Sequence, residues 1–158
     1  MNMIVAYCKN RGIGISNTLP WKIPIDLKYF KVTTSNDCVV MGKNTWLSLP
    51  KKPLAKRENI VLSSSLKMEN AIVFNNKENL LKYITKKKDT VWIIGGETIY
   101  KSFIASEKLD KIYVTFINED FECDRFFPEI PTNFKCIETG SYNNVGNIFY
   151  RFEIYQRV

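Results

Sequence analysis

Apolar residues recur along this chain in short runs separated by polar segments, and the length of the runs favours strands over long helices. Six runs, at residues 4–7, 38–41, 60–62, 72–74, 91–94 and 112–117, contain many β-branched and aromatic side chains, as buried strands do. Two later segments, 135–138 and 148–155, flank a stretch rich in asparagine at 143–147. This arrangement predicts a C-terminal antiparallel hairpin.

Helical patterns lie between the strands. Pro24 suits the first position of a helix that runs to about residue 33, because its fixed φ matches the helix. Asn75 or Asn76 can cap a second helix with an apolar stripe. A third stripe spans residues 97–105.

Strands that alternate with helices predict an α/β fold. We expect a single domain over residues 1–158, with a mixed, mostly parallel central sheet of about eight strands. The sheet is expected to end in the C-terminal antiparallel hairpin and to carry about four flanking helices.

The composition restricts the class of this protein and its expected location. The chain is 45% hydrophobic and 13% aromatic, which suits a compact globular protein. It has no run of about 18 or more apolar residues and no signal-peptide pattern. Its four cysteines form no C-x-x-C pair, and no histidine is present. We therefore predict free thiols, no metal site and a cytoplasmic location.

The net charge of +7 comes from 23 basic and 16 acidic residues. A basic balance of this kind suits either a nucleic-acid surface or a field that attracts small polyanions, such as phosphorylated cofactors. Charge alone does not decide between these two alternatives.

One carboxylate has an unusual setting. Asp26 lies in the sequence among Trp21, Leu27 and Phe30. Because the chain lacks histidine, proton chemistry near neutral pH needs another group. An aspartate in a first helical turn usually interacts favourably with the helix dipole, which lowers its pKa, whereas burial raises the pKa. If burial dominates, Asp26 can hold or relay a proton at neutral pH.

Candidate anion-binding groups follow several predicted strands. Gly95-Gly96 joins a strand to a helix, a junction that lets backbone approach a ligand closely, although an ordinary tight turn has the same pattern. Donors also follow two other strands, at Lys43, Asn44 and Thr45 and at Ser63 and Ser64. A helix cap at Asn44 or Thr45 and a serine-rich turn are the alternatives. P-loop spacing is absent, which argues against a Walker-type nucleoside triphosphatase.

In their order and spacing these pieces resemble dihydrofolate reductase over nearly the whole chain. The matching motifs include Leu19-Pro20-Trp21, Pro24-x-Asp26-Leu27-x-x-Phe30, Val40-Met41-Gly42-Lys43-Asn44-Thr45-Trp46, Leu54-x-x-Arg57-x-Asn59-Ile60-Val61-Leu62-Ser63, Ile94-Gly95-Gly96-x-x-Ile99-Tyr100 and Asp124-x-x-Phe127-Pro128. The resemblance implies a dihydrofolate reductase-like fold and NADPH-dependent reduction of dihydrofolate to tetrahydrofolate, in support of one-carbon metabolism and thymidylate synthesis. A hydride would reach C6 of the pterin and a proton would reach N5.

The resemblance also implies roles for single residues. Asp26 would hydrogen-bond the pterin, Thr115 would bridge the carboxylate and the pterin, and Trp21 would hold an ordered water. Arg57 would grip the α-carboxylate of the substrate's glutamate, a task that suits a bidentate guanidinium. Other implied substrate-binding positions are Ile4, Val5, Ala6, Leu27, Phe30, Leu49, Leu54, Ile94 and Tyr100.

For NADPH, the resemblance makes Lys43 the expected 2′-phosphate partner and Lys77 a second candidate. Gly95-Gly96 resembles the family's glycine pair, which is joined by a cis peptide. Residues 9–23 correspond to a mobile loop, and Asp124 resembles a residue that pairs with it. The full set of implied cofactor positions is Ala6, Ile13, Gly14, Leu19, Gly42, Lys43, Asn44, Thr45, Leu62, Ser63, Ser64, Lys77, Gly95, Gly96, Glu97, Thr98, Ile99 and Tyr100.

Two other functions remain open at this point. Another NADPH reductase of the same fold, such as a pyrimidine reductase, would share the nucleotide-side signals and lack the pair of Asp26 and Arg57. A basic nucleic-acid-binding module would instead cluster aromatic and basic residues on one face. As partners we expect dihydrofolate and its analogues, with no nucleic acid and no membrane, and we expect a monomer.

Overall fold

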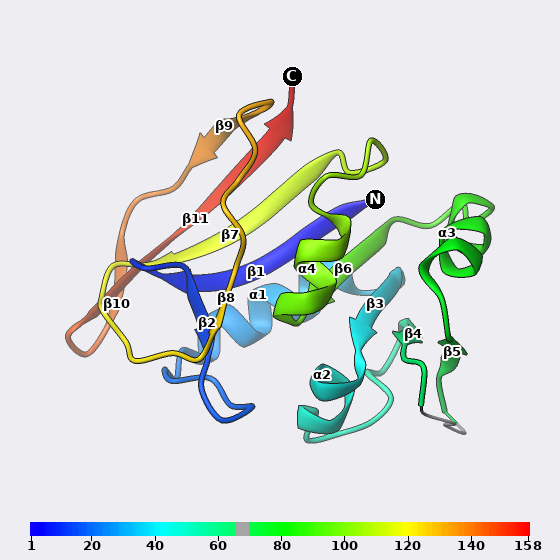
Figure 1. Cartoon of the computed structure of the whole chain (residues 1–158). Helices are drawn as coiled ribbons and strands as arrows, with labels where there is room; N and C mark the ends of the chain where they lie inside the picture. Colours follow the sequence, from blue (N-terminus) through cyan, green and yellow to red (C-terminus); the bar gives the residue numbers. More distant parts are fainter. Residues whose placement is uncertain (66–69) are drawn as a thin grey trace.

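The computed structural model describes residues 1–65 and 70–158 (Figure 1). Its strands are β1 (Asn2–Cys8), β2 (Gly12–Gly14), β3 (Cys38–Gly42), β4 (Glu58–Leu62), β5 (Ile72–Phe74), β6 (Val91–Gly95), β7 (Lys111–Ile117), β8 (Arg125–Phe126), β9 (Phe134–Thr139), β10 (Asn143–Val145) and β11 (Ile148–Arg157). Its helices are α1 (Pro24–Thr34), α2 (Lys43–Ser48), α3 (Lys77–Thr85) and α4 (Glu97–Phe103).

A mixed sheet of nine strands forms the centre of the described structure. The strand order is β10-β11-β7-β1-β6-β3-β4-β5, and β9 also pairs with β11. From β5 to β7 all neighbouring strands are parallel, whereas β11 is antiparallel to β7. The expected fold, a mostly parallel sheet with an antiparallel C-terminal end and four helices, is confirmed.

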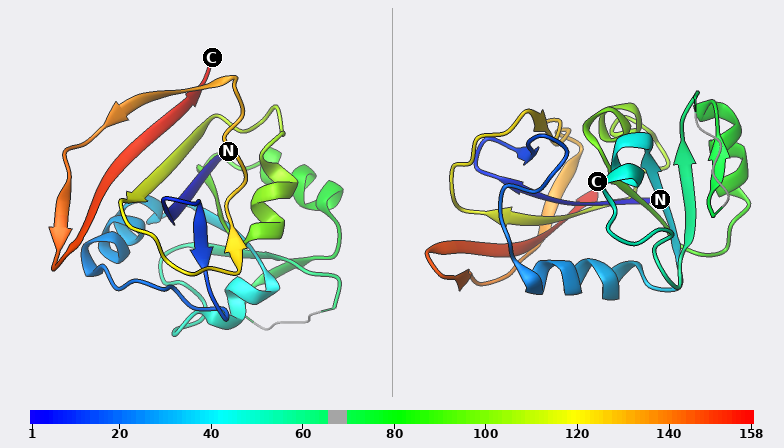
Figure 2. Two further views of the ribbon diagram at one scale, coloured as in Figure 1. Left: turned by 60° about the vertical axis from the view of Figure 1, so that its left-hand side comes forward. Right: turned by 90° about the horizontal axis from the view of Figure 1, so that it is seen from below.

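The sheet separates two cores, because successive side chains of a strand point to opposite faces. On β1, Met3, Val5 and Tyr7 pack into the core that α3 and α4 cover. Ile4 contributes to a core on the other face, where Tyr29 and Phe30 of α1 pack against it. Figure 2 shows α1 and α4 on opposite sides of the sheet.

Local sequence explains where the helices begin. Pro24 occupies the first position of α1, as expected. Asn76, rather than Asn75, caps α3, and its side chain accepts a hydrogen bond of 2.9 Å from the Asn79 N–H. Helix α2 begins directly after Gly42, so the alternative in which Asn44 or Thr45 caps this helix is wrong.

The C-terminal hairpin forms as predicted, with a tighter turn than the asparagine-rich stretch indicates. Val145 of β10 pairs with Ile148 of β11, which leaves a two-residue turn. Gly146 in this turn has a φ of 58°, a conformation that glycine adopts at little cost. None of the described helices is long and apolar enough to cross a membrane.

Candidate active site

Asp26 and Thr115 meet on the face of the sheet that α1 covers. The Thr115 hydroxyl on β7 donates a hydrogen bond of 2.6 Å to Oδ1 of Asp26, in the first turn of α1. Burial raises the pKa of Asp26 above its ordinary value, and the hydrogen bond from Thr115 opposes this shift. Burial is the larger effect on the pKa. The sequence required this if Asp26 is to hold or relay a proton near neutral pH.

Apolar side chains surround this pair. Among the expected substrate positions, Ile4 belongs to a buried cluster against which Phe30, Leu49, Leu54 and Ile94 pack. Ala6 packs against the neighbouring cluster that contains Trp21. An apolar wall of this kind excludes water and strengthens every polar interaction inside it.

Three of the expected substrate positions, Val5, Leu27 and Tyr100, lie differently, and Tyr100 packs in the core on the opposite face of the sheet. The side chain of Val5 packs with Met3 and Tyr7 on the opposite face of the sheet, because it alternates with Ile4 and Ala6 along β1. Only the main chain of Val5 can therefore take part on the Asp26 side. Leu27 follows Asp26 on α1, and its side chain is 57% exposed.

Trp21 is buried beside this site, with 6% of its surface exposed. Its ring meets the ring of Phe121 edge-on at 5.5 Å between centroids. The indole N–H finds no acceptor among the residues that the structure describes. A buried N–H group normally has a partner, so this orientation suits a site whose polar contacts come from a bound molecule or water.

Arg57 is held at the rim of the same face. Its Nε donates to the Ala55 carbonyl at 3.0 Å, and one terminal nitrogen donates to Thr34 Oγ1 at 3.0 Å. Its guanidinium carbon lies 5.7 Å from the centre of the Phe30 ring. These contacts fix the guanidinium plane, which is what bidentate binding of a carboxylate needs.

Thr34 and Asn59 support this corner of the site, and our sequence reasoning missed both. Thr34 is fully buried at the end of α1. Asn59 is 4% exposed, and its side chain bonds to both main-chain groups of Leu54 and to the carbonyl of Arg57. The available signal was a polar residue directly before the apolar run at residues 60–62 of strand β4, because a polar residue that is buried there needs hydrogen-bond partners.

The expected phosphate donors gather at the carboxyl ends of parallel strands. Gly42 of β3 pairs with Leu62 of β4, so Lys43 and Ser63 follow neighbouring strands at one edge of the sheet. Parallel sheets of this kind bind ligands at that edge. Gly95 and Gly96 lie at the end of β6 and are joined by a cis peptide bond, as the resemblance implied.

The glycines at this edge leave no room for larger side chains. A Cβ atom on Gly42 would lie 2.9 Å from Cγ1 of Ile99. Gly95 has a φ of +118°, and a Cβ atom there would lie 3.2 Å from the Tyr100 ring. Tyr100 itself is fixed by a hydrogen bond of 2.7 Å from its hydroxyl to the Ile4 carbonyl. The backbone therefore forms a closely packed cradle at this edge.

We expect Gly95→Ala to lower the free energy of unfolding by at least about 2 kcal/mol, because alanine is strained at this positive φ and crowds a fixed ring. Urea denaturation measures the change. Gly140→Ala is the matched control, since a Cβ atom there makes an ordinary contact of 3.5 Å with the Phe152 carbonyl. An equal loss in both variants would contradict the steric argument.

The segment 9–23 is tied to β8 and its surroundings. Gly12 and Gly14 of β2 pair with β8. Asp124 accepts a hydrogen bond of 3.0 Å from the Ser16 N–H, and its own N–H donates to the Gly14 carbonyl at 2.9 Å. The expected pairing of Asp124 with this loop is confirmed. Leu19, near the loop's end, is 50% exposed.

Two further expected cofactor positions make internal contacts. Glu97 accepts a hydrogen bond of 2.9 Å from the Phe126 N–H and so ties α4 to β8. The ammonium of Lys77 donates to the Ser102 carbonyl and lies 4.9 Å from the centre of the Phe103 ring. A phosphate role for Lys77 stays a prediction and would require this ammonium to exchange its partner.

Comparison with known proteins gives a consistent result. A family model described as dihydrofolate reductase matches residues 1–157. A dihydrofolate reductase of Drosophila melanogaster is 39% identical over 149 residues, which cover 85% of this chain and 82% of the fly protein. One from Buchnera aphidicola is 36% identical over 163 residues and 99% of each chain. A solved Enterococcus faecalis dihydrofolate reductase, complexed with NADP(H) and RAB-propyl, superposes with a TM-score of 0.90 at 33% identity, covering 99% of this chain and 95% of that chain.

Proposed function

The chain belongs to the dihydrofolate reductase family, and on that premise we propose how its own residues carry out the NADPH-dependent reduction of dihydrofolate to tetrahydrofolate. The observation that carries the proposal is the hydrogen bond between half-buried Asp26 and buried Thr115 beside the apolar wall. Burial raises the pKa of the Asp26 carboxyl, which suits a group that holds a proton near neutral pH.

Asp26 is the group that binds and orients the pterin. Its carboxylate accepts hydrogen bonds from the amino group and ring nitrogen of the pterin, while Thr115 donates to Oδ1 and holds the carboxylate in place. Because burial raises its pKa, Asp26 favours protonation at N5 near neutral pH. The indole N–H of Trp21 makes this residue suitable for binding the water molecule that connects to the site.

The residues at the carboxyl edge of the sheet fit NADPH. The close backbone at Gly42, Gly95 and Gly96 lets a pyrophosphate approach main-chain N–H groups. Lys43, Asn44, Thr45, Ser63 and Ser64 supply the cation and the donors for the adenosine phosphates. When bound, NADPH supplies the hydride that reaches C6 of the pterin.

We expect Lys43→Met to raise the KM for NADPH about tenfold and to leave the KM for NADH nearly unchanged, because the lost charge would face only the 2′-phosphate. Steady-state kinetics with both cofactors measure this difference. Lys51→Met, at another exposed lysine, is the control. Equal changes for NADPH and NADH would show that Lys43 does not contact the 2′-phosphate.

Further parts of the proposal concern partners and location. We propose that residues 1–158 act as one catalytic domain and as a monomer, in the cytoplasm. The basic charge then serves phosphorylated and carboxylated small molecules rather than nucleic acid. Sedimentation of the chain tests whether it is a monomer. A salt titration of its retention on DNA-cellulose tests whether its basic charge binds nucleic acid.

Loss of NADPH absorbance with and without dihydrofolate tests the function directly. Dihydrofolate-dependent oxidation of NADPH is expected, together with retention on methotrexate-agarose and elution by folate. A pyrimidine reductase would find no acceptor for the hydride in this assay, so the addition of dihydrofolate would not cause NADPH oxidation. A nucleic-acid-binding module would leave the column with salt instead, by counterion release.

A further inference from the structure

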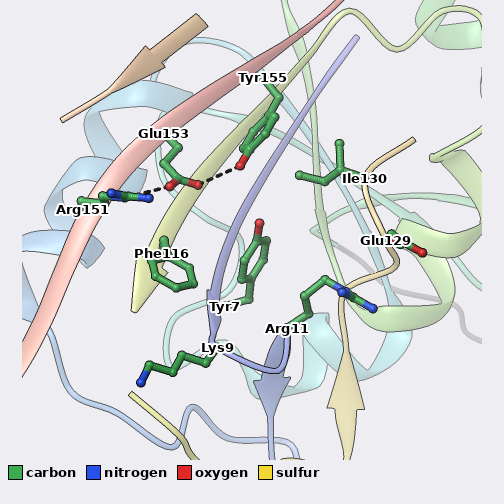
Figure 3. Close-up of a pocket in the computed structure, with 9 residues that line it drawn as sticks. All are labelled: Tyr7, Lys9, Arg11, Phe116, Glu129, Ile130, Arg151, Glu153 and Tyr155. Atoms are coloured by element: carbon green, nitrogen blue, oxygen red, sulfur yellow. Dashed lines mark hydrogen bonds and ion pairs between the residues drawn. The ribbon is translucent and has the colours of Figure 1, made fainter. Parts of the chain in front are cut away.

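A cavity of about 380 Å³ lies on the face of the sheet opposite Asp26 (Figure 3). Tyr7 of β1 pairs with Phe116 of β7, and Phe116 pairs with Arg151 of β11. These three side chains therefore form one row across adjacent strands and line the cavity. Thr115 precedes Phe116 and points to the other face, so the sheet itself separates the cavity from the pterin site.

Arg151 is held rigidly in this cavity. Its Nε donates a hydrogen bond of 2.8 Å to Glu153, and its guanidinium carbon lies 5.6 Å from the centre of the Phe116 ring and 4.8 Å from that of Tyr142. None of the residues in the described ranges accepts a hydrogen bond from its terminal NH₂ groups. A guanidinium fixed on one edge, with donors available on the other, is pre-organised for an anion.

Both carboxylate oxygens of Glu153 accept hydrogen bonds from other side chains of the protein. The residue is 5% exposed, and its two oxygens accept hydrogen bonds from Arg151 Nε at 2.8 Å and from the Tyr155 hydroxyl at 3.1 Å. Figure 3 shows this chain of contacts at one end of the cavity. The carboxylate therefore neutralises Arg151 and fixes it, and it does not point a free charge toward a ligand.

Two further cations lie at the cavity. Lys9 and Arg11 reach it from the turn after β1. In the part of the chain that the structure describes, neither makes an ion pair. Among the described residues, Glu129 is the one other carboxylate that lines the cavity, and it is exposed. The balance of charge at the opening is therefore positive, which favours an anionic ligand.

The cavity wall between these cations is aromatic. The rings of Tyr7 and Phe116 meet edge-on with centroids 6.2 Å apart. Burial, with a smaller contribution from Glu153, raises the pKa of Tyr7 to about 12, so its hydroxyl stays neutral. An aromatic wall beside the fixed guanidinium of Arg151 and the ammonium of Lys9 suits a ligand that combines a planar ring with a negative charge.

We propose that this cavity binds a small aromatic carboxylate, at a site separate from the pterin and NADPH sites. The planar ring of the ligand packs against Phe116, while Tyr7, which is 7% exposed and stacked on Phe127 with centroids 5.7 Å apart, forms part of the cavity lining. Its carboxylate accepts hydrogen bonds from the terminal nitrogens of Arg151 and pairs with Lys9.

The test uses 2-naphthoate as the probe and the full chain saturated with NADPH and methotrexate, so that the pterin and cofactor sites are filled. Isothermal titration is expected to give one site with a dissociation constant of about 0.1–1 mM. The neutral analogue 2-naphthalenemethanol is expected to bind at least tenfold more weakly. Changes in amide chemical shifts are expected to centre on residues 7 and 116.

Charge variants locate the binding. Lys9→Met is expected to weaken naphthoate binding about fivefold and Arg151→Met at least tenfold, whereas Lys88→Met, at an exposed lysine elsewhere, leaves it unchanged. Arg151→Met can fail to fold, because it leaves the buried Glu153 without its cation. Lys9 is exposed, so its variant keeps the test decisive. Naphthoate binding that methotrexate abolishes, that Lys9→Met does not change, or that the neutral analogue matches would overturn the proposal.

Discussion

Asp26→Asn is expected to lower the turnover of dihydrofolate about a hundredfold or more, the usual effect of removing a group that favours proton transfer. The reason lies in the buried geometry. Asparagine keeps an oxygen that can accept the Thr115 hydrogen bond, but it carries no charge and does not favour protonation of N5. NADPH affinity should change little, because the expected cofactor groups lie at the carboxyl edge of the sheet.

The same substitution should stabilise the folded protein at neutral pH. Between the pKa of an unfolded aspartate, about 4, and the raised pKa of the folded state, the folded chain holds a proton that the unfolded chain has released. Stability therefore falls as pH rises through this window and stays lower above it. Asparagine has no such pH-dependent loss, so the melting temperature of the variant should exceed that of the parent at neutral pH.

Stopped-flow kinetics at several pH values and thermal melts measure the two effects. Asp120→Asn, at an exposed aspartate, is the control and should change neither. Full activity in Asp26→Asn would remove the residue from the mechanism. A lower melting temperature at neutral pH would show that burial does not dominate the ionisation of Asp26.

Arg57→Leu is expected to raise the KM for dihydrofolate about a hundredfold, since two hydrogen bonds to a charged carboxylate are lost. Turnover at saturating substrate should fall much less, because Arg57 lies at the rim and does not touch the reacting atoms. For a dihydropterin that lacks the glutamate, the KM should barely change.

The comparison of these two substrates makes the test specific. Lys56→Met removes a neighbouring exposed charge and should leave both KM values close to those of the parent. A general disturbance of the site by Arg57→Leu would raise the KM for both substrates equally. That outcome would exclude a direct contact between Arg57 and the substrate's carboxylate.

The sequence predicts most of the fold because short apolar runs rich in β-branched residues and proline or asparagine at helix starts are strong local signals. It misses the pairing of β2 with β8, since strands of three and two residues have no periodicity to detect. It also misses the start of α2, where Gly42 precedes the helix without a capping side chain. Such boundaries depend on tertiary packing, here the close approach of Gly42 to Ile99.

For the site, local reasoning identifies Asp26 by its apolar setting and the resemblance supplies Arg57, but neither identifies the residues that hold these two side chains. In the sequence, Thr34 has the pattern of an ordinary helical residue. Only the fold places it against Arg57, 23 residues later in the chain, whose guanidinium donates a hydrogen bond to it. The direction of Val5 depends on which face of β1 packs against α1, and that follows only from the complete sheet. Long-range contacts of this kind cannot be inferred from spacing along a single chain.

The central position of β1 has a consequence for the order in which the protein can form. Strand β1 pairs with β6 and β7, whose residues follow about ninety and more positions later in the chain. A nascent chain that ends before residue 111 lacks β7. It can therefore form neither that side of the sheet nor the hydrogen bond between Thr115 and Asp26. Folding must therefore wait for non-local contacts, which makes it slow compared with local assembly, and the pair of Asp26 and Thr115 can form only after β7 has been synthesised.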